Sequence, residues 1–187
     1  MVAADMERQF KIAVLGSASV PSDSADAQKA FRIGQGIASR AGILVTGGCP
    51  GLPHFAVQGT ADAGGYSVAI SPAMNREEHD EIYGYPLDSR VIVYTGMGRK
   101  GRNVILIRSA DACVFLGGGM GTLNEFTIAF DELGTDCAIG VLPDSPGLTG
   151  WFARLVSVVG RRPRALIREE ADPDRLLDGI FEHLLQD

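Results

Sequence analysis

The sequence predicts an α/β fold, namely a Rossmann-like doubly wound parallel sheet of about six or seven strands with helices on both faces. Two observations predict it. Short β-branched runs alternate with helical patterns along the chain, and most of the runs are apolar throughout. Parallel strands covered on both faces lack the alternation of half-exposed strands, and strand–helix alternation implies right-handed crossovers.

The strands are expected, in order, at residues 11–15, 43–46, 66–70, 90–94, 111–116, 137–142 and 164–167. The helices are expected at residues 26–41, 52–63, 100–109, 122–133, 148–159 and 173–185. The first helix places apolar residues at three- and four-residue spacings, which gives it one apolar face. Residues 71–89 form a long irregular stretch, and loops of that length in a compact domain are more often functional than idle.

Length and composition favour one folded domain, a Rossmann-like nucleotide- or phosphate-binding domain over residues 1–187. With 45% hydrophobic and 21% charged residues, the chain does not have the composition of a disordered protein. Its net charge of −6 disfavours general binding to nucleic acid, which relies on clustered cations. No nucleic-acid partner is expected.

Cysteine usage and the N-terminal stretch bear on location. Cys49, Cys113 and Cys137 are widely spaced and fit neither a disulfide framework nor a zinc site. Residues 1–11 lack the apolar segment of a signal peptide, and no apolar run approaches the ~20 residues of a membrane helix. We expect a cytoplasmic protein with no membrane partner, no bound metal and no resident cofactor.

Three glycine-containing turns, 16–19, 46–51 and 117–122, follow expected strands. Ligands of open parallel sheets bind beyond the carboxyl ends of the strands, and glycine lets backbone N–H groups approach an anion. The candidate phosphate-binding residues are Gly16, Ser17, Gly47, Gly48, Gly51, Gly118, Gly119, Met120, Gly121 and Thr122. The alternative is that these are only tight turns. The spacing matches neither a standard dinucleotide site nor a P-loop.

Thr122 and Glu125 stand in the T-x-x-E pattern of a helix capping box. In that interpretation Thr122 caps the helix and Glu125 folds back onto the cap. The alternative is a catalytic carboxylate on the first helical turn. The sequence leaves both interpretations open.

Arg99, Lys100 and Arg102 lie at an expected helix start. They could form a solvated surface, but cations oppose the helix dipole there and indicate a bound anion nearby. The run 104–107 is apolar on every side, which predicts burial by the sheet or by a partner chain.

Three further residues have side chains that could react or bind a metal. Cys49 lies at an expected helix start that would lower its pKa, although a small apolar filler is the commoner use of cysteine. His54 is expected to pack on a loop or at the surface. His79 lies in the acidic run 77–81, which matches no standard metal site and is expected to be a solvated face.

Residues 101–125, GRNVILIRSADACVFLGGGMGTLNE, resemble the LONELY GUY superfamily, whose mark is PGGxGTxxE preceded by an Arg-Lys pair. Gly117 replaces the Pro, Arg102 matches the catalytic Arg, Glu125 matches the catalytic Glu, and Asn103 stands where the Lys would be. Residues 46–72 resemble the second glycine loop and helix of the family. Thr95-Gly-Met-Gly98 and Arg102-Asn103 are closer to the branch with the molybdenum-cofactor carrier proteins. The resemblance implies a homodimer with the ligand site near its interface.

The resemblance leaves two functions open. One is hydrolysis of the N-glycosidic bond of a nucleoside 5′-monophosphate, giving base and ribose 5-phosphate. Glu125 would then stabilise an oxocarbenium-like state or position the water, and Arg102 would stabilise charge. The 5′-phosphate would lie on Gly118, Gly119, Gly121 and Thr122. The other is a non-catalytic nucleotide or molybdenum-cofactor carrier. In both, Arg102 and Glu125 are expected to face one pocket formed by the 47–51 and 117–122 loops.

Overall fold

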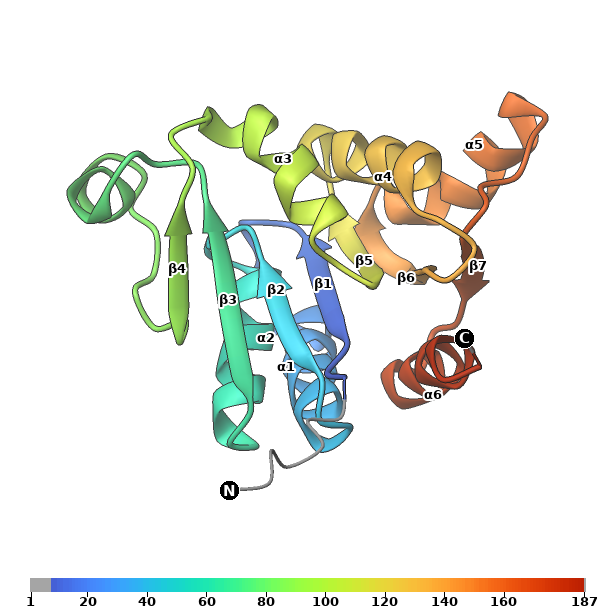
Figure 1. Ribbon diagram of the computed structural model, residues 1–187, viewed down its shortest axis with the longest axis horizontal. Coiled ribbons are helices and arrows are strands. Elements are labelled where there is room, and N and C mark those ends of the chain that lie inside the picture. Colours follow the sequence, from blue (N-terminus) through green and yellow to red (C-terminus); the bar gives the residue numbers. More distant parts are fainter. Residues whose placement is uncertain (1–7, 187) are drawn as a thin grey trace, which may run out of the picture.

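The structure of the protein is a computed structural model that describes residues 8–186. The first seven residues, on which much of the signal-peptide interpretation depends, lie outside the described residues. Seven parallel strands form one sheet in the order β4-β3-β2-β1-β5-β6-β7 (Figure 1). The predicted doubly wound α/β fold is therefore confirmed.

The strands are β1 (Lys11–Gly16), β2 (Ile43–Thr46), β3 (Tyr66–Ser71), β4 (Val91–Tyr94), β5 (Ala112–Gly118), β6 (Ala138–Gly147) and β7 (Leu166–Glu169). The helices are α1 (Ala25–Ser39), α2 (Leu52–Asp62), α3 (Gly98–Arg108), α4 (Met120–Glu132), α5 (Phe152–Val159) and α6 (Pro173–Leu184). A 3-10 turn, Thr149–Trp151, precedes α5. No helix within residues 8–186 combines the length and apolar character that crossing a membrane requires.

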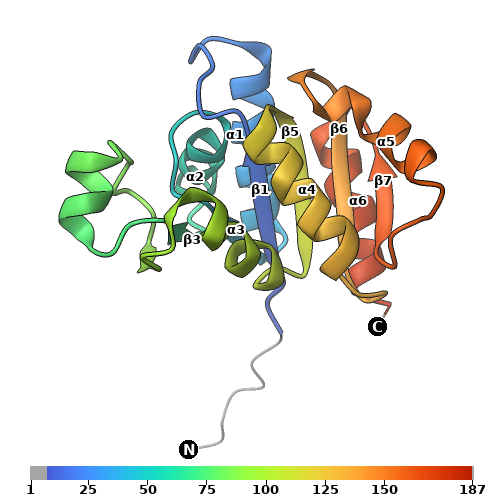
Figure 2. The same ribbon diagram turned by 90° about the horizontal axis from the view of Figure 1, so that it is seen from above.

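Two apolar cores cover the two faces of the sheet. One holds α1, α2 and α6 against side chains such as Ile12 and Val14, and the other holds α3, α4 and the start of α5 against Ala13 and Leu15 (Figures 1 and 2). Successive residues of β1 thus point into opposite cores, which is why the strands are apolar on both faces. Because α1 and α4 follow the adjacent strands β1 and β5 but lie on opposite faces, a crevice opens at the carboxyl ends of these strands.

The stretch 71–89 is less irregular than expected, because it contains a π-helical turn at Glu78–Ile82. His79 of this turn is fully buried. Its Nδ1 lies 2.7 Å from the Ser71 hydroxyl and its Nε2 lies 2.9 Å from the Pro86 carbonyl oxygen. A carbonyl only accepts, so Nε2 donates and Nδ1 accepts from Ser71.

The expectation that His79 belongs to a solvated face was therefore wrong. The ring packs edge-on against Tyr85 and Tyr94, with centroids 5.5 and 5.9 Å away. Its acidic neighbours Glu77 and Asp80 are exposed, as the interpretation of the charge run required. His79 thus anchors this segment to the end of β3.

Candidate functional site

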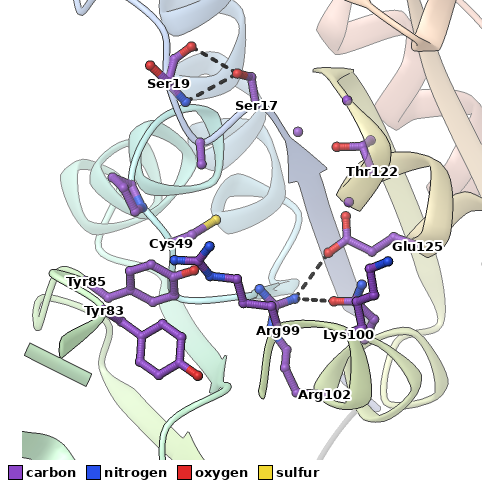
Figure 3. A pocket seen from close by; sticks show the side chains of 16 residues that line it. Ser17, Ser19, Cys49, Tyr83, Tyr85, Arg99, Lys100, Arg102, Thr122 and Glu125 are labelled. Carbon is purple, nitrogen blue, oxygen red and sulfur yellow. Dashed lines mark hydrogen bonds and ion pairs between the residues drawn. The ribbon is translucent and has the colours of Figure 1, made fainter. Parts of the chain in front are cut away.

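A cavity of about 590 Å³ lies at the carboxyl ends of the central strands (Figure 3). Residues from the turn after β1, the 46–51 turn, the 71–89 segment, α3 and the start of α4 line it. The lining residues are Gly16, Ser17, Ala18, Ser19, Cys49, Pro50, Tyr83, Tyr85, Arg99, Lys100, Arg102, Asn103, Gly119, Gly121, Thr122 and Glu125.

The end of β1 and the turn that follows it contribute Gly16 and Ser17. A Cβ on Gly16 would lie 2.3 Å from the Leu116 carbonyl oxygen, so only glycine allows β1 and β5 to approach this closely. The Ser17 hydroxyl accepts from the Ser19 backbone N–H at 3.2 Å and donates to its carbonyl at 3.0 Å, which closes the turn. The turn therefore holds its backbone at the cavity wall.

The turn after β5 leads into α4, which begins at Met120 with Gly119 as its N-cap. No side chain caps this helix within the described residues, so N–H groups of its first turn are available to an anion. Gly119, Gly121 and Thr122 line the cavity, whereas Gly118 and the largely exposed Met120 do not. Gly118 adopts a φ of +95°, and a Cβ there would lie 2.1 Å from the Thr122 hydroxyl oxygen.

The capping-box interpretation of Thr122 and Glu125 was wrong. The helix starts at Met120, two residues before the expected start, so Thr122 lies inside the first turn and Glu125 lies in the second. Glu125 is too far along the helix to reach back to the N-cap, and its carboxylate instead meets Arg102. Gly118 permits this earlier start, because its positive φ and its close approach to Thr122 exclude a side chain at that position.

In the 46–51 turn, Cys49 and Pro50 line the cavity, while the three glycines support it from behind. A Cβ on Gly47 would lie 2.1 Å from Nη2 of Arg102, so this position makes room for the guanidinium. A Cβ on Gly48 would lie 3.1 Å from the His79 ring, and one on Gly51 would lie 2.3 Å from the Ser17 carbonyl oxygen.

Arg102 and Glu125 form a buried ion pair at the centre of the cavity wall. Their side chains are 5% and 11% exposed, and Nη1 of Arg102 lies 3.1 Å from Oε1 of Glu125. The same Nη1 donates to the Asn103 side-chain oxygen at 2.7 Å, and Asn103 donates onward to Asn124 at 2.8 Å. The buried Nε of Arg102 has no partner among the described residues. The pair therefore keeps a donor unsatisfied beside the cavity.

Burial raises the pKa of Glu125 to about 7, against an opposing effect of the Arg102 charge and its hydrogen bond. A carboxyl group with this pKa changes protonation state at neutral pH. Such a group can act as a general acid or base. The arrangement thus combines a proton-exchanging carboxyl group, a fixed positive charge and an uncapped helix N-terminus.

Cys49 is a thiol at neutral pH, because burial raises its pKa to about 11. The expectation that the helix start lowers its pKa was wrong, since loss of solvation exceeds the effect of the neighbouring Arg102 charge. His54 lies outside the cavity lining, where its Nε2 is 2.7 Å from an Asp88 carboxylate oxygen.

One end of the cavity is aromatic and cationic. Tyr83 and Tyr85 come from the 71–89 segment, and their ring centroids are 5.3 Å apart. The Arg99 guanidinium lies over the Tyr83 ring, 5.5 Å from its centroid. Sequence reasoning selected the segment by its length but neither tyrosine, because nothing local indicates that they reach α3.

The outer face of α3 is only partly covered. Leu106 and Ile107 are fully buried, whereas Val104 and Ile105 are 43% and 36% exposed. The apolar run 104–107 is therefore buried on one side by the chain itself, and its other side faces solvent.

Comparison with known proteins gives one matching family model, described as the SLOG cluster4 family, over residues 9–146. An uncharacterized protein of Archaeoglobus fulgidus is 34% identical over 123 residues, 66% of this chain and 75% of that protein. A cytokinin riboside 5′-monophosphate phosphoribohydrolase of Mycobacterium tuberculosis is 30% identical over 171 residues, 88% of each chain.

Solved structures with the same fold include two molybdenum cofactor proteins. The molybdenum cofactor carrier protein of Chlamydomonas reinhardtii has a TM-score of 0.73 at 24% identity, covering 95% of this chain and 99% of that one. The molybdenum cofactor binding protein of Rippkaea orientalis has a TM-score of 0.72 at 24% identity, covering 94% and 98%. At this identity the likeness concerns the fold alone.

Proposed function

The chain belongs to the SLOG cluster4 family, within the LONELY GUY-like superfamily, and from this premise we propose that it is a nucleoside 5′-monophosphate phosphoribohydrolase. Its ligand carries a phosphate that lies on the N-terminus of α4, with Gly119, Gly121 and Thr122 at the contact. The products are a free base and ribose 5-phosphate.

The observation that carries the proposal is the buried Arg102–Glu125 pair beside this phosphate site. Hydrolysis breaks the bond between C1′ and the base nitrogen and forms a bond between C1′ and the oxygen of water. Glu125, with its pKa of about 7, takes a proton from that water, and this proton then passes from Glu125 to the nitrogen of the departing base. Arg102 keeps the Glu125 carboxylate oriented and offers charge to the phosphate.

The test is direct. The pure protein is incubated with a panel of nucleoside 5′-monophosphates, and ribose 5-phosphate and free base are both quantified. We expect equal amounts of the two products from at least one substrate. Binding of nucleotides without release of either product would contradict the hydrolase.

A second candidate function is non-catalytic binding of a nucleotide or of molybdenum cofactor as cargo. Asn103 favours it, because this residue stands where the superfamily carries a lysine and instead hydrogen-bonds Arg102 and Asn124. The similar fold of the molybdenum cofactor carrier protein supports it further. Stable, stoichiometric loading with cofactor, together with no turnover of any nucleotide, would favour the carrier.

We also propose that the protein forms a homodimer through the exposed side of α3. Val104 and Ile105 leave a partly uncovered apolar strip beside Met97, which is 53% exposed. We expect light scattering to give a dimer at micromolar concentration. Ile105→Glu should give a folded monomer, because the partner would have to bury a charge.

Val158→Glu is the matched control for the dimer. Val158 is 77% exposed on α5, and this substitution should leave the dimer intact. A monomeric wild-type protein, or an Ile105→Glu variant that remains a dimer, would contradict the assembly.

A further inference from the structure

Tyr83, Tyr85 and Arg99 line the cavity but have no part in the mechanism above. We propose that they recognise the heterocycle of the ligand and select one whose edge carries two neighbouring hydrogen-bond acceptors, as O6 and N7 of a 6-oxopurine do. The inference rests on the proposed function in placing the ligand phosphate at α4 and the sugar beside Glu125.

The cavity has two chemically different ends (Figure 3). Ser17, Ser19 and Thr122 lie toward one end, and Tyr83 and Tyr85 lie toward the other, with the Arg102–Glu125 contact between them. A nucleotide has its phosphate, sugar and base in the same order. A ligand whose phosphate lies at the glycine end and whose sugar lies beside Glu125 would therefore place its base against the tyrosines.

The aromatic end is rigid enough to recognise a ligand. Tyr85 is 8% exposed and packs against His79, whose two ring nitrogens are both held by hydrogen bonds. Tyr83 is partly exposed beside Tyr85, and its ring offers a flat surface on which any base can stack, which gives affinity without discrimination. Discrimination must therefore come from a polar group held at the edge of the stacked ring.

Arg99 is that group. Its guanidinium lies over the Tyr83 ring at the cavity wall, and no carboxylate among residues 8–186 pairs with it in an ion pair. A guanidinium carries five N–H donors in a fixed fork and no acceptor. Two of these donors match the adjacent O6 and N7 acceptors of guanine, whereas adenine presents an amino donor in place of O6.

Charge in the cavity argues against a second phosphate as the partner of Arg99. The lining contains three cations, Arg99, Lys100 and Arg102, and one carboxyl group, Glu125, which is partly ionised near pH 7. A phosphate monoester carries about −1.5 to −2 at this pH, which already offsets most of the excess positive charge. Arg99 is better matched to a neutral acceptor edge.

A pterin presents the same pair of acceptors in its ring oxygen O4 and nitrogen N5, so the chemistry alone does not separate the two heterocycles. The experiment therefore uses GMP, IMP and AMP beside neopterin monophosphate as the pterin probe. Titration calorimetry measures dissociation constants for the wild-type protein and for Glu125→Gln, which is used to prevent turnover during the titration. 7-Deaza-GMP, which lacks the N7 acceptor, tests the edge without altering the protein.

We expect the oxo compounds, namely GMP, IMP and neopterin monophosphate, to bind about tenfold more tightly than AMP. We expect 7-deaza-GMP to bind about tenfold more weakly than GMP. The relative affinities of GMP and neopterin monophosphate then identify the source of the acceptor pair. Arg99→Ala should bring the oxo compounds down to the affinity of AMP. Arg108→Ala is the matched control, because it removes an exposed cation from the far end of α3 and should keep the preference.

Equal or tighter binding of AMP would overturn the inference, and so would a preference for oxo compounds that survives Arg99→Ala. These outcomes are distinct from failure of the proposed function. A preference for GMP without release of ribose 5-phosphate would retain the recognition and reject the hydrolase. Hydrolysis with no preference between GMP and AMP would retain the hydrolase and reject the recognition by Arg99.

Discussion

Glu125→Gln is expected to abolish turnover while the protein still folds and still binds nucleoside monophosphate. The amide keeps the shape of the side chain and can accept from Arg102 through its carbonyl oxygen, but it cannot take a proton from water. We expect a loss of about 10²- to 10⁴-fold in kcat, the usual contribution of a general base. Ribose 5-phosphate release and titration calorimetry on the same preparation measure the two effects.

The pH profile tests the same assignment. A group with a pKa of about 7 that acts as its carboxylate makes turnover rise as the pH increases through 7 and level off above it. Turnover that falls as the pH increases through 7 would mean that Glu125 acts in its protonated form, as a general acid. An unchanged kcat in Glu125→Gln would contradict any role in the reaction.

The same carboxyl group links stability to pH. Its pKa is raised in the folded protein from an ordinary value of 4.5 to about 7, so the folded state binds more protons between these values. The stability that protonated Glu125 provides is complete below about pH 4.5 and is lost as the pH rises through 7, an effect of about 3 kcal/mol. Urea unfolding at pH 5 and pH 8 should show this loss in wild type and much less of it in Glu125→Gln.

Much of the fold could be predicted because the apolar character of each strand is visible in its own residues. β1 and β5 are apolar at nearly every position, as buried parallel strands are, and helices with one apolar face separate the strands. The start of α4 could not be predicted in the same way. The T-x-x-E pattern satisfies a local rule for a helix start at Thr122, but the helix begins at Met120, after the positive φ of Gly118.

The candidate site was only partly predictable for a related reason. Glycines after strands indicate the edge of the sheet at which a ligand could lie, but the pattern does not separate lining residues from supporting ones. Gly119 faces the cavity, whereas Gly47 lies behind Arg102. His79 ties the segment that carries Tyr83 and Tyr85 to Ser71 at the end of β3, and nothing in the acidic run around His79 indicates that this histidine is buried.

Removing Arg102 from the Arg102–Glu125 ion pair should destabilise the protein more than the Glu125→Gln substitution does. Arg102→Met keeps much of the buried stem but leaves the Glu125 carboxyl group without its cation. Because Arg102 lowers the pKa of Glu125, the pKa should rise further above 7 in this variant. We expect a larger loss in the free energy of unfolding at pH 8 than at pH 5, because at pH 8 the buried carboxyl group must take up a proton to stay neutral, and that uptake costs up to about 1.4 kcal/mol more than in the wild type. Ligand affinity and turnover should fall together, since a charge-assisted contact is lost at about 1.5–3 kcal/mol.

The double variant Arg102→Met, Glu125→Gln separates the ion pair from simple packing. With no charge left to bury, the double variant should recover much of the stability that Arg102→Met loses at pH 8. At pH 5, where Glu125 is already neutral, the second substitution should recover little. Urea unfolding of the four proteins at both pH values gives the coupling energy between the two side chains. A coupling energy that is the same at pH 5 and pH 8 would mean that Arg102 stabilises the protein through packing and hydrogen bonds, and not through the charge of Glu125.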